Sequence, residues 1–172
     1  MCEILFHIYR LFFIFNHMSK AELDDIDRRI LNALQVDASQ TNHDLAQQVH
    51  VSAPTCLRRV KQLTQAGVIE KQVAIVAPQL VGARLTAIIE ITLDVQAAER
   101  MAQFEQHVSL DAAILQCYRV TPGPDFVLIA QVADMPEYHA LAHRLFAAQT
   151  NVRNVKCYFS TLRSKFETRI QL

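Results

Sequence analysis

The sequence predicts an α+β protein in two parts, a helical N-terminal part and a C-terminal part in which strands and helices alternate. In the first part, apolar residues recur at helical spacing in successive stretches between Leu23 and Leu63. In the second part, strand-like and helix-like stretches follow one another between Leu85 and Ser164. With 172 residues, of which 51% are hydrophobic, the chain is long enough for two small folded domains.

Residues 1–17 differ in composition from the rest of the chain. They form an apolar run that is interrupted by Arg10, has Glu3 where a signal peptide carries positive charge, and lacks a small-residue cleavage site. The run is also too short to span a bilayer. We interpret it as a translated leader or disordered tail before a true start at Met18. The alternatives are a membrane anchor and a segment that covers a neighbouring subunit.

Residues 24–36 are predicted to form the first helix, because their apolar residues share one face. A second helix is predicted to begin at Thr41, whose side-chain oxygen can cap free backbone N–H groups. A third is predicted to begin at Ser52, with Pro54 in its first turn, and to end at Gly67. The second and third helices together make a helix-turn-helix.

The alternating residues 68–78 predict a two-stranded wing after the third helix. We therefore expect residues 18–78 to form a winged helix-turn-helix domain and residues 79–172 to form a second domain. Segment 18–77 has seven basic and seven acidic residues, so it lacks the positive charge of a monomeric DNA-binding domain. DNA affinity would have to come from several copies that bind together.

The third predicted helix has an apolar side and a basic side. Cys56, Leu57, Val60 and Leu63 share the apolar side, because successive residues turn by about 100°. A helix of this kind fits the major groove, where Arg contacts guanine, Gln contacts adenine and flanking cations contact phosphates. The residues predicted to contact DNA are Ser52, Pro54, Thr55, Arg58, Arg59, Lys61 and Gln62. The alternative is an ordinary amphipathic helix with a solvated basic face.

The C-terminal part has the predicted order βαββαβ. The expected elements are strand 85–93, helix 96–108, strands 113–121 and 126–133, helix 136–149 and strand 155–164. This order predicts a ferredoxin-like domain, whose antiparallel sheet carries helices on one face. We expect the other face to expose Ile89, Ile91 and either Val127 or Ile129, and to bury them against a second copy in a dimer.

Four stretches carry a resemblance to a known family. They are LDDIDRRILNALQVDA at 23–38, VSAPTCLRRVKQL at 51–63, AGVI at 66–69 and VTPGPDFVLIAQVADMPEY at 120–138. From Leu23 to the C-terminus, roughly nine-tenths of its length, the chain resembles the Lrp/AsnC, or feast/famine, family of transcription regulators. The resemblance implies a DNA-binding domain and a ferredoxin-like domain that assembles dimers into octamers and binds an amino acid between subunits.

The resemblance also implies a ligand loop in the turn before residue 126. Family members carry there a glycine, two variable residues, an aspartate and an aromatic residue, whereas this chain has proline at the glycine position, in PGPDF at 122–126. Asp125 is expected to accept from the ammonium group of an amino acid, and backbone amides to donate to its carboxylate. The predicted ligand-binding residues are Thr121, Pro122, Gly123, Pro124, Asp125, Phe126, Met135, Tyr158, Phe159 and Ser160.

Alternative roles for these residues remain open. Met135 and the three residues on the last strand would otherwise be packing residues, and Asp125 would be a turn residue that caps the backbone. The two prolines remove two N–H donors from the loop. Apolar neighbours such as Met135 and Phe159 favour leucine or methionine as the amino acid.

Other chemistry is weakly represented. Cys2, Cys56, Cys117 and Cys157 form no close pairs, which speaks against zinc and disulfides and suits a reducing cytoplasm. His139 and His143 lie one helical turn apart, half of a metal site without nearby partners. No nucleophile–base signature or phosphate-binding loop is present, so we expect no enzyme and no cofactor.

We expect a sequence-specific, DNA-binding transcriptional regulator that responds to a small amino acid and binds double-stranded DNA as a dimer or octamer. One alternative is an architectural DNA-binding protein that responds to no ligand. Another is a regulatory subunit of a metabolic enzyme, against which the basic face of 52–62 speaks.

Overall fold

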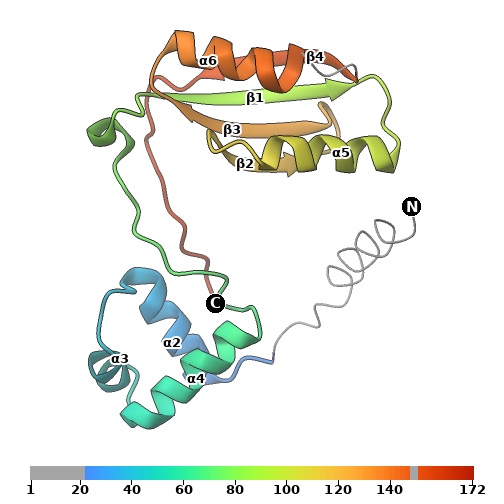
Figure 1. Cartoon of the computed structure of the whole chain (residues 1–172). Coiled ribbons are helices and arrows are strands. Elements are labelled where there is room, and N and C mark those ends of the chain that lie inside the picture. The colour runs from blue at the N-terminus through green and yellow to red at the C-terminus, as the bar shows by residue number, and fades with distance from the viewer. Residues whose placement is uncertain (1–21, 148–150) are drawn as a thin grey trace. The chain divides into compact units, whose positions relative to one another are not determined.

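The computed structural model describes residues 22–147 and 151–172, so the expected leader at 1–17 lies outside the described residues. The described chain divides into two units (Figure 1). Residues 22–74 form the first together with 167–172, and the second contains the described residues from 75 to 166. In the first unit, the Gln35 side chain accepts a hydrogen bond from the Ile170 N–H at 2.8 Å and donates to its carbonyl at 3.2 Å. The last residues of the chain are therefore bound to the first helix of this unit.

The first unit contains three helices, α2 (Asp25–Val36), α3 (Asn42–Gln48) and α4 (Ala53–Gln65). Their starts follow from capping residues. The Thr41 side chain accepts from the backbone N–H of Asp44, and the Ser52 side chain accepts from that of Thr55. The predicted starts at Thr41 and Ser52 are confirmed.

One core holds the three helices together. Its buried residues are Ile30, Leu31, Ala33, Leu45, Ala46, Val49, Cys56 and Leu63. Between α3 and α4 the chain turns at His50, which adopts a left-handed conformation with φ of 57°, and the N–H of Val51 donates to the carbonyl of Ala46. After α4, Gly67 takes φ of 72°, so the predicted helix end is also confirmed.

The predicted two-stranded wing at 68–78 is wrong in its secondary structure. Residues 70–77, all described, belong to no helix or strand, and the turn η1 (Pro78–Val81) follows them. A tight two-stranded hairpin needs residues such as Asn, Asp or Gly in its turn, and this segment has none. The alternation of apolar residues there was a poor sign of pairing, because an isolated hairpin is only marginally stable in water.

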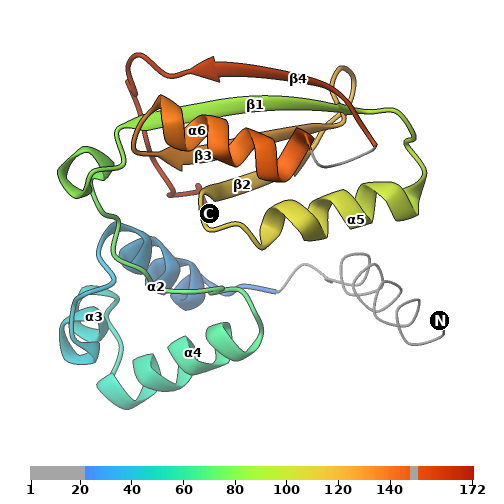
Figure 2. The ribbon, with the colours of Figure 1, turned by 45° about the horizontal axis from the view of Figure 1, so that its top comes forward.

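The second unit has the predicted βαββαβ order. Its elements are β1 (Leu85–Leu93), α5 (Ala98–Ser109), β2 (Ile114–Arg119), β3 (Phe126–Val132), α6 (Met135–Ala142) and β4 (Val152–Phe159), and the π-helical turn η2 (His143–Ala147) continues α6. The sheet has the order β2-β3-β1-β4, with antiparallel neighbours. Helices α5 and α6 lie on one face of it (Figure 2), and their apolar residues share one core with β1 and β3.

The faces of β1 differ from the prediction. Ile89 and Ile91 are fully buried beneath the helices, so the expectation that they lie on the open face is wrong. Ile88 and Glu90 point to the open face instead, opposite Ile129 and Val127 of β3. Alternation could not tell the faces apart, because isoleucine occupies both 88 and 89.

The last strand begins three residues before and ends five residues before the predicted 155–164. Its end follows from its partner. The Ser160 N–H still donates to the Thr86 carbonyl at 2.9 Å, and β1 itself begins at Leu85, so nothing beyond remains to pair with. At its other end, Leu93 pairs with Val152.

Candidate functional site

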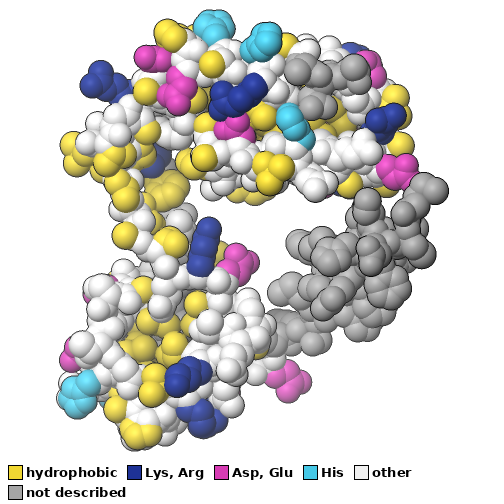
Figure 3. Space-filling view, viewed as in Figure 1, with side chains coloured by type: hydrophobic (Ala, Val, Ile, Leu, Met, Phe, Trp, Pro, Cys, Tyr) yellow, Lys and Arg dark blue, Asp and Glu magenta, His cyan; other side chains and the backbone are white. Residues whose placement is uncertain are grey.

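Helix α4 presents most of the predicted DNA-contacting residues to solvent. Ser52, Pro54, Arg58, Lys61 and Gln62 are exposed and Thr55 is half-buried. The Arg58 guanidinium donates to the Gln62 side-chain oxygen at 3.0 Å, so these two side chains, one helical turn apart, lie on one face. Figure 3 shows basic side chains on the surface above α4. The face carries the guanidinium, ammonium and amide groups that can donate to base edges and phosphates.

Leu57, predicted on the apolar side, is 45% exposed, so that part of the interpretation is wrong. The buried residues of α4 are Cys56 and Leu63, with Ala53 and Val60 partly buried beside them. Leu57 follows Cys56 by about 100° around the helix, which carries its side chain beyond the core.

Arg59 lies apart from the exposed face. Its Nη1 donates to a carboxylate oxygen of Asp24 and, at 3.0 Å, to one of Asp27, both at the start of α2. The pKa of the Asp24 carboxyl is lowered, first by the hydrogen bond it accepts from the Asp27 backbone N–H and then by Arg59. The pKa of the Arg59 guanidinium is raised by the same ion pair. The expected DNA contact by Arg59 is not supported, because its Nη1 is already bound within the unit and its side chain is only 21% exposed.

The candidate ligand loop is closed by Asp125, which is 8% exposed. Its Oδ2 accepts from the Leu93 N–H at 2.7 Å, and its own N–H donates to the Ile91 carbonyl at 2.8 Å. Gly123 takes φ of 119°, which side-chain-bearing residues rarely adopt. Within the described chain, Oδ1 of Asp125 receives no hydrogen bond. Asp125 therefore holds the loop against β1 and keeps one oxygen for another donor.

The other predicted ligand residues lie at the opposite end of β1. Ser160 binds Thr86, Tyr158 pairs with Ile88, and Met135 follows the strand that pairs with Leu85. The loop lies instead beside the strand's last residues. Because each strand residue advances by about 3.3 Å, Tyr158 lies roughly 13 Å and Ser160 roughly 20 Å along β1 from the loop. One copy of the chain does not bring them together.

Tyr158 and Phe159 point to opposite faces of the sheet. Tyr158 is 52% exposed on the open face, opposite Ile88. The Phe159 ring packs edge-on against Tyr138 of α6, with 4.9 Å between the ring centroids. The geometry favours Tyr158 as a ligand or interface residue and Phe159 as a packing residue.

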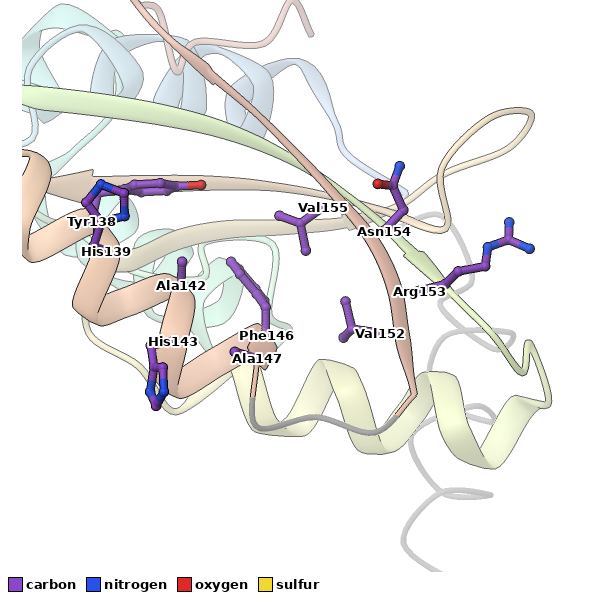
Figure 4. A pocket seen from close by; sticks show the side chains of 10 residues that line it. All are labelled: Tyr138, His139, Ala142, His143, Phe146, Ala147, Val152, Arg153, Asn154 and Val155. Carbon is purple, nitrogen blue, oxygen red and sulfur yellow. The ribbon is translucent and has the colours of Figure 1, made fainter.

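Sequence reasoning missed an open pocket of about 560 Å³ between α6, η2 and β4 (Figure 4). Its lining includes Tyr138, Phe146 and Val155 together with His139 and His143, and none of the predicted ligand residues. No group of three metal-ligating side chains occurs among the described residues. In the part of the chain that the structure describes, we find no helix with the length and hydropathy of a membrane span.

Comparison with known proteins agrees with both units. A family model described as "Winged helix-turn-helix DNA-binding" matches residues 23–70, and one described as "Lrp/AsnC ligand binding domain" matches residues 86–170. The leucine-responsive regulatory protein of Escherichia coli is 34% identical over 137 residues, which cover 80% of this chain and 84% of that protein. An HTH-type transcriptional regulator of Haemophilus influenzae is 35% identical over 147 residues, covering 86% and 87%.

Solved structures share the architecture. A transcriptional regulator from Neisseria meningitidis, in complex with L-Met, is similar with a TM-score of 0.80 at 28% identity, covering 87% of this chain and 96% of that chain. An AsnC family regulator from Agrobacterium tumefaciens has a TM-score of 0.80 at 30% identity, covering 87% and 97%. The chain therefore belongs to the Lrp/AsnC family of transcriptional regulators, proteins with an N-terminal DNA-binding domain and a C-terminal ligand-binding domain.

Proposed function

We propose that this regulator reads a palindromic DNA sequence through α4 and that an amino acid bound between two copies controls its assembly or DNA binding. The observation that carries the first part is the exposed face of α4, where Arg58, Gln62 and Lys61 point away from the core. A two-fold dimer presents this face twice, so its target has two half-sites.

The division of the ligand residues supports a site between copies. The loop around Asp125 lies beside the last residues of β1, Ser160 lies beside its first residues, and Tyr158 lies between them, opposite Ile88. When two copies pack their open sheet faces with their β1 strands antiparallel, the loop of one meets the Tyr158 end of the other, twice by symmetry. The open face carries Ile88, Val127 and Ile129, apolar side chains that such packing would remove from water.

Leucine or methionine is the favoured ligand. Asp125 can accept from its ammonium group through Oδ1, and an apolar side chain would lie near Met135, which is 40% exposed. The names of two similar proteins agree with this choice. One is called leucine-responsive, and the other was solved in complex with L-Met.

A regulator without a ligand is the second candidate. Pro122 and Pro124 remove two N–H donors from the loop, and Leu93 already uses one Asp125 oxygen. These observations favour an architectural DNA-binding protein in which the loop only closes the hairpin between β2 and β3.

A thermal-shift screen of the full chain against the twenty amino acids separates the two candidates. A ligand at 100 times its dissociation constant adds about 2.7 kcal/mol to the stability of the state it binds. We expect leucine or methionine to raise the melting temperature and to change binding to DNA selected from a random pool. No shift with any amino acid, together with intact DNA binding, would favour the architectural protein. Failure to select any DNA sequence would contradict both.

A further inference from the structure

We propose that Arg59 is a positioning residue that locks the DNA-reading helix α4 onto the start of α2, and that it does not contact DNA. The inference rests on the proposed reading of DNA through α4 and deepens it. It names the group that sets the direction in which the neighbouring residues Arg58, Lys61 and Gln62 point.

The start of α2 is organised to receive one cation. Asp24 uses Oδ1 to cap the helix, accepting from the N–H groups of Ile26 and Asp27 at 2.9 Å each, and its Oδ2 binds Arg59. Asp27 uses Oδ2 to accept from the Asp24 N–H at 3.4 Å, and its Oδ1 binds Arg59. Each carboxylate thus divides its oxygens between the capping box and the guanidinium. The cap and the lock form one network.

Burial distinguishes the Arg59–Asp27 pair from a surface ion pair, whereas the Asp24 side chain is 48% exposed. The Arg59 side chain is 21% exposed and that of Asp27 is 14% exposed. Charges that are removed from water in this way keep their attraction better than exposed ones, and the loss of one partner leaves the other uncompensated. The partners lie 35 and 32 residues from Arg59 in the sequence, so the contact joins separate helices.

The position of Arg59 on α4 explains why a lock is useful. The two buried residues of α4, Cys56 and Leu63, are seven residues apart and lie within about 20° of one line along the helix. Ala53 and Val60, partly buried against the same core, lie about 60° and 40° from Cys56 on one flank of that line, and Arg59 lies on the other flank. Arg59 lies about 60° from Cys56, so its ion pair holds α4 from the side. Rotation of α4 would turn Arg58 and Gln62 away from the bases they read.

Asp27→Asn in the full chain tests the proposal, with DNA selected by the wild-type chain as the probe. We expect binding to the selected sequence to weaken by about fivefold or more, binding to unrelated DNA to change little, and the salt dependence to stay the same. If Arg59 instead contacted a DNA phosphate, Asp27→Asn would remove a carboxylate that competes for Arg59. DNA binding would then stay unchanged or become stronger. Asp25→Asn is the matched control, because it removes the same charge from the same helical turn without touching Arg59.

Arg59→Lys keeps the charge, but the lysine ammonium group ends one covalent bond short of Nη1, the single nitrogen of Arg59 that reaches both carboxylates. The lock predicts the same loss of sequence preference with an unchanged salt slope. A lysine that binds as well as wild type, or an Arg59→Gln variant whose salt slope falls by about 0.9, would overturn the proposal. The double variant Arg59→Gln, Asp27→Asn should lose no more DNA affinity than the worse of the two single variants, because both changes remove the same Arg59–Asp27 contact.

Amide hydrogen exchange of the full chain tests, in the absence of DNA, whether the Arg59 ion pair holds α4 in place. Asp27→Asn and Arg59→Lys should each raise exchange of the Arg58–Gln62 amides about tenfold, whereas Asp25→Asn should not. Unchanged exchange would overturn the lock. If the wild-type chain selects no DNA sequence, the proposed function is contradicted. The exchange measurement still tests the ion-pair lock in that case. Circular dichroism and thermal unfolding show whether each variant is folded. If Asp27→Asn is unfolded, Arg59→Lys takes its place as the test of the lock.

Discussion

The two functional regions differ in how much of a site one copy of the chain contains. The proposed DNA-reading face of α4 is complete in one copy, from its cap at Ser52 to the Arg58–Gln62 pair. The proposed ligand residues are spread along β1, with Asp125 beside its last residues and Tyr158 beside Ile88.

This difference separates a function that one copy of the chain can perform from one that needs two copies. Contacts within one helix and its neighbours suffice to build a DNA-reading surface, whereas an amino-acid site of the proposed kind needs a second copy. Changes that break assembly should therefore remove sensing altogether, and changes on α4 should leave it intact.

The largest effect is expected from Ile129→Lys, which places a charge on the open sheet face. The proposed dimer should dissociate because burying an unpaired ammonium group costs more than the apolar contact provides. Light scattering should show a monomer, with no ligand-induced thermal shift and on the order of 100-fold weaker binding to a palindromic DNA site. Leu110→Lys is the control, since Leu110 is 83% exposed beside α5. A dimeric Ile129→Lys protein would place the interface elsewhere.

Asp125 tests the sensing half of the comparison. Asp125→Asn keeps an acceptor for the Leu93 N–H but removes the charge, so the amino-acid-induced thermal shift should disappear while DNA affinity without ligand stays near wild type. Asp125→Ala should in addition lower stability by about 1–3 kcal/mol, because the Leu93 N–H loses its partner. Calorimetric titration with leucine and methionine checks the first effect, and an Asp125→Asn protein with unchanged ligand affinity would show that the ligand binds elsewhere.

Arg58 and Lys61 test the local half. Arg58→Ala should cost about 1–3 kcal/mol of DNA binding and relax the preference at one base pair of each half-site. Lys61→Ala should weaken binding to all sequences and lower the salt slope by about 1. Both variants should keep the ligand-induced thermal shift. Unchanged sequence preference in Arg58→Ala, measured by repeated selection, would mean that α4 presents a different face.

The smallest effect is expected at the turn between α3 and α4. His50 has φ of 57°, a conformation that costs side-chain-bearing residues about 1 kcal/mol and glycine little. His50→Gly should therefore leave stability unchanged or raise it by up to about 1 kcal/mol in thermal unfolding. His43→Gly, inside α3, should instead lower it by about 1 kcal/mol. Equal losses in both would contradict the assigned strain at His50.

Sequence patterns predicted the local features and missed the long-range ones. The caps at Thr41 and Ser52 and the full extent of β1 depend on neighbouring residues, so they were predictable. The ion pair of Arg59 was not predicted, because its partners lie more than thirty residues away in the sequence. A helical projection of α4 shows only the direction in which Arg59 points from the helix axis. The faces of β1 were misassigned because Ile88 and Ile89 fit either side.

The candidate ligand site shows the same limit. The sequence marks the loop at 121–126 and Tyr158, but only the register of the sheet reveals that they lie apart along β1. A resemblance to a family assigns expected roles to single residues. It does not show which copy of the chain contributes each residue to the site.

Complementation between two defective copies tests most directly whether the amino-acid site is shared. Asp125→Asn and Tyr158→Ala chains should each fail to bind leucine or methionine alone. Mixed in equal amounts and allowed to exchange subunits, they should recover about a quarter of the wild-type sites, because half of the dimers are mixed and each of these has one intact site. Calorimetric titration counts these sites. No recovery in a mixture whose subunits have exchanged would show that Asp125 and Tyr158 of the same copy serve one site, and would contradict the account.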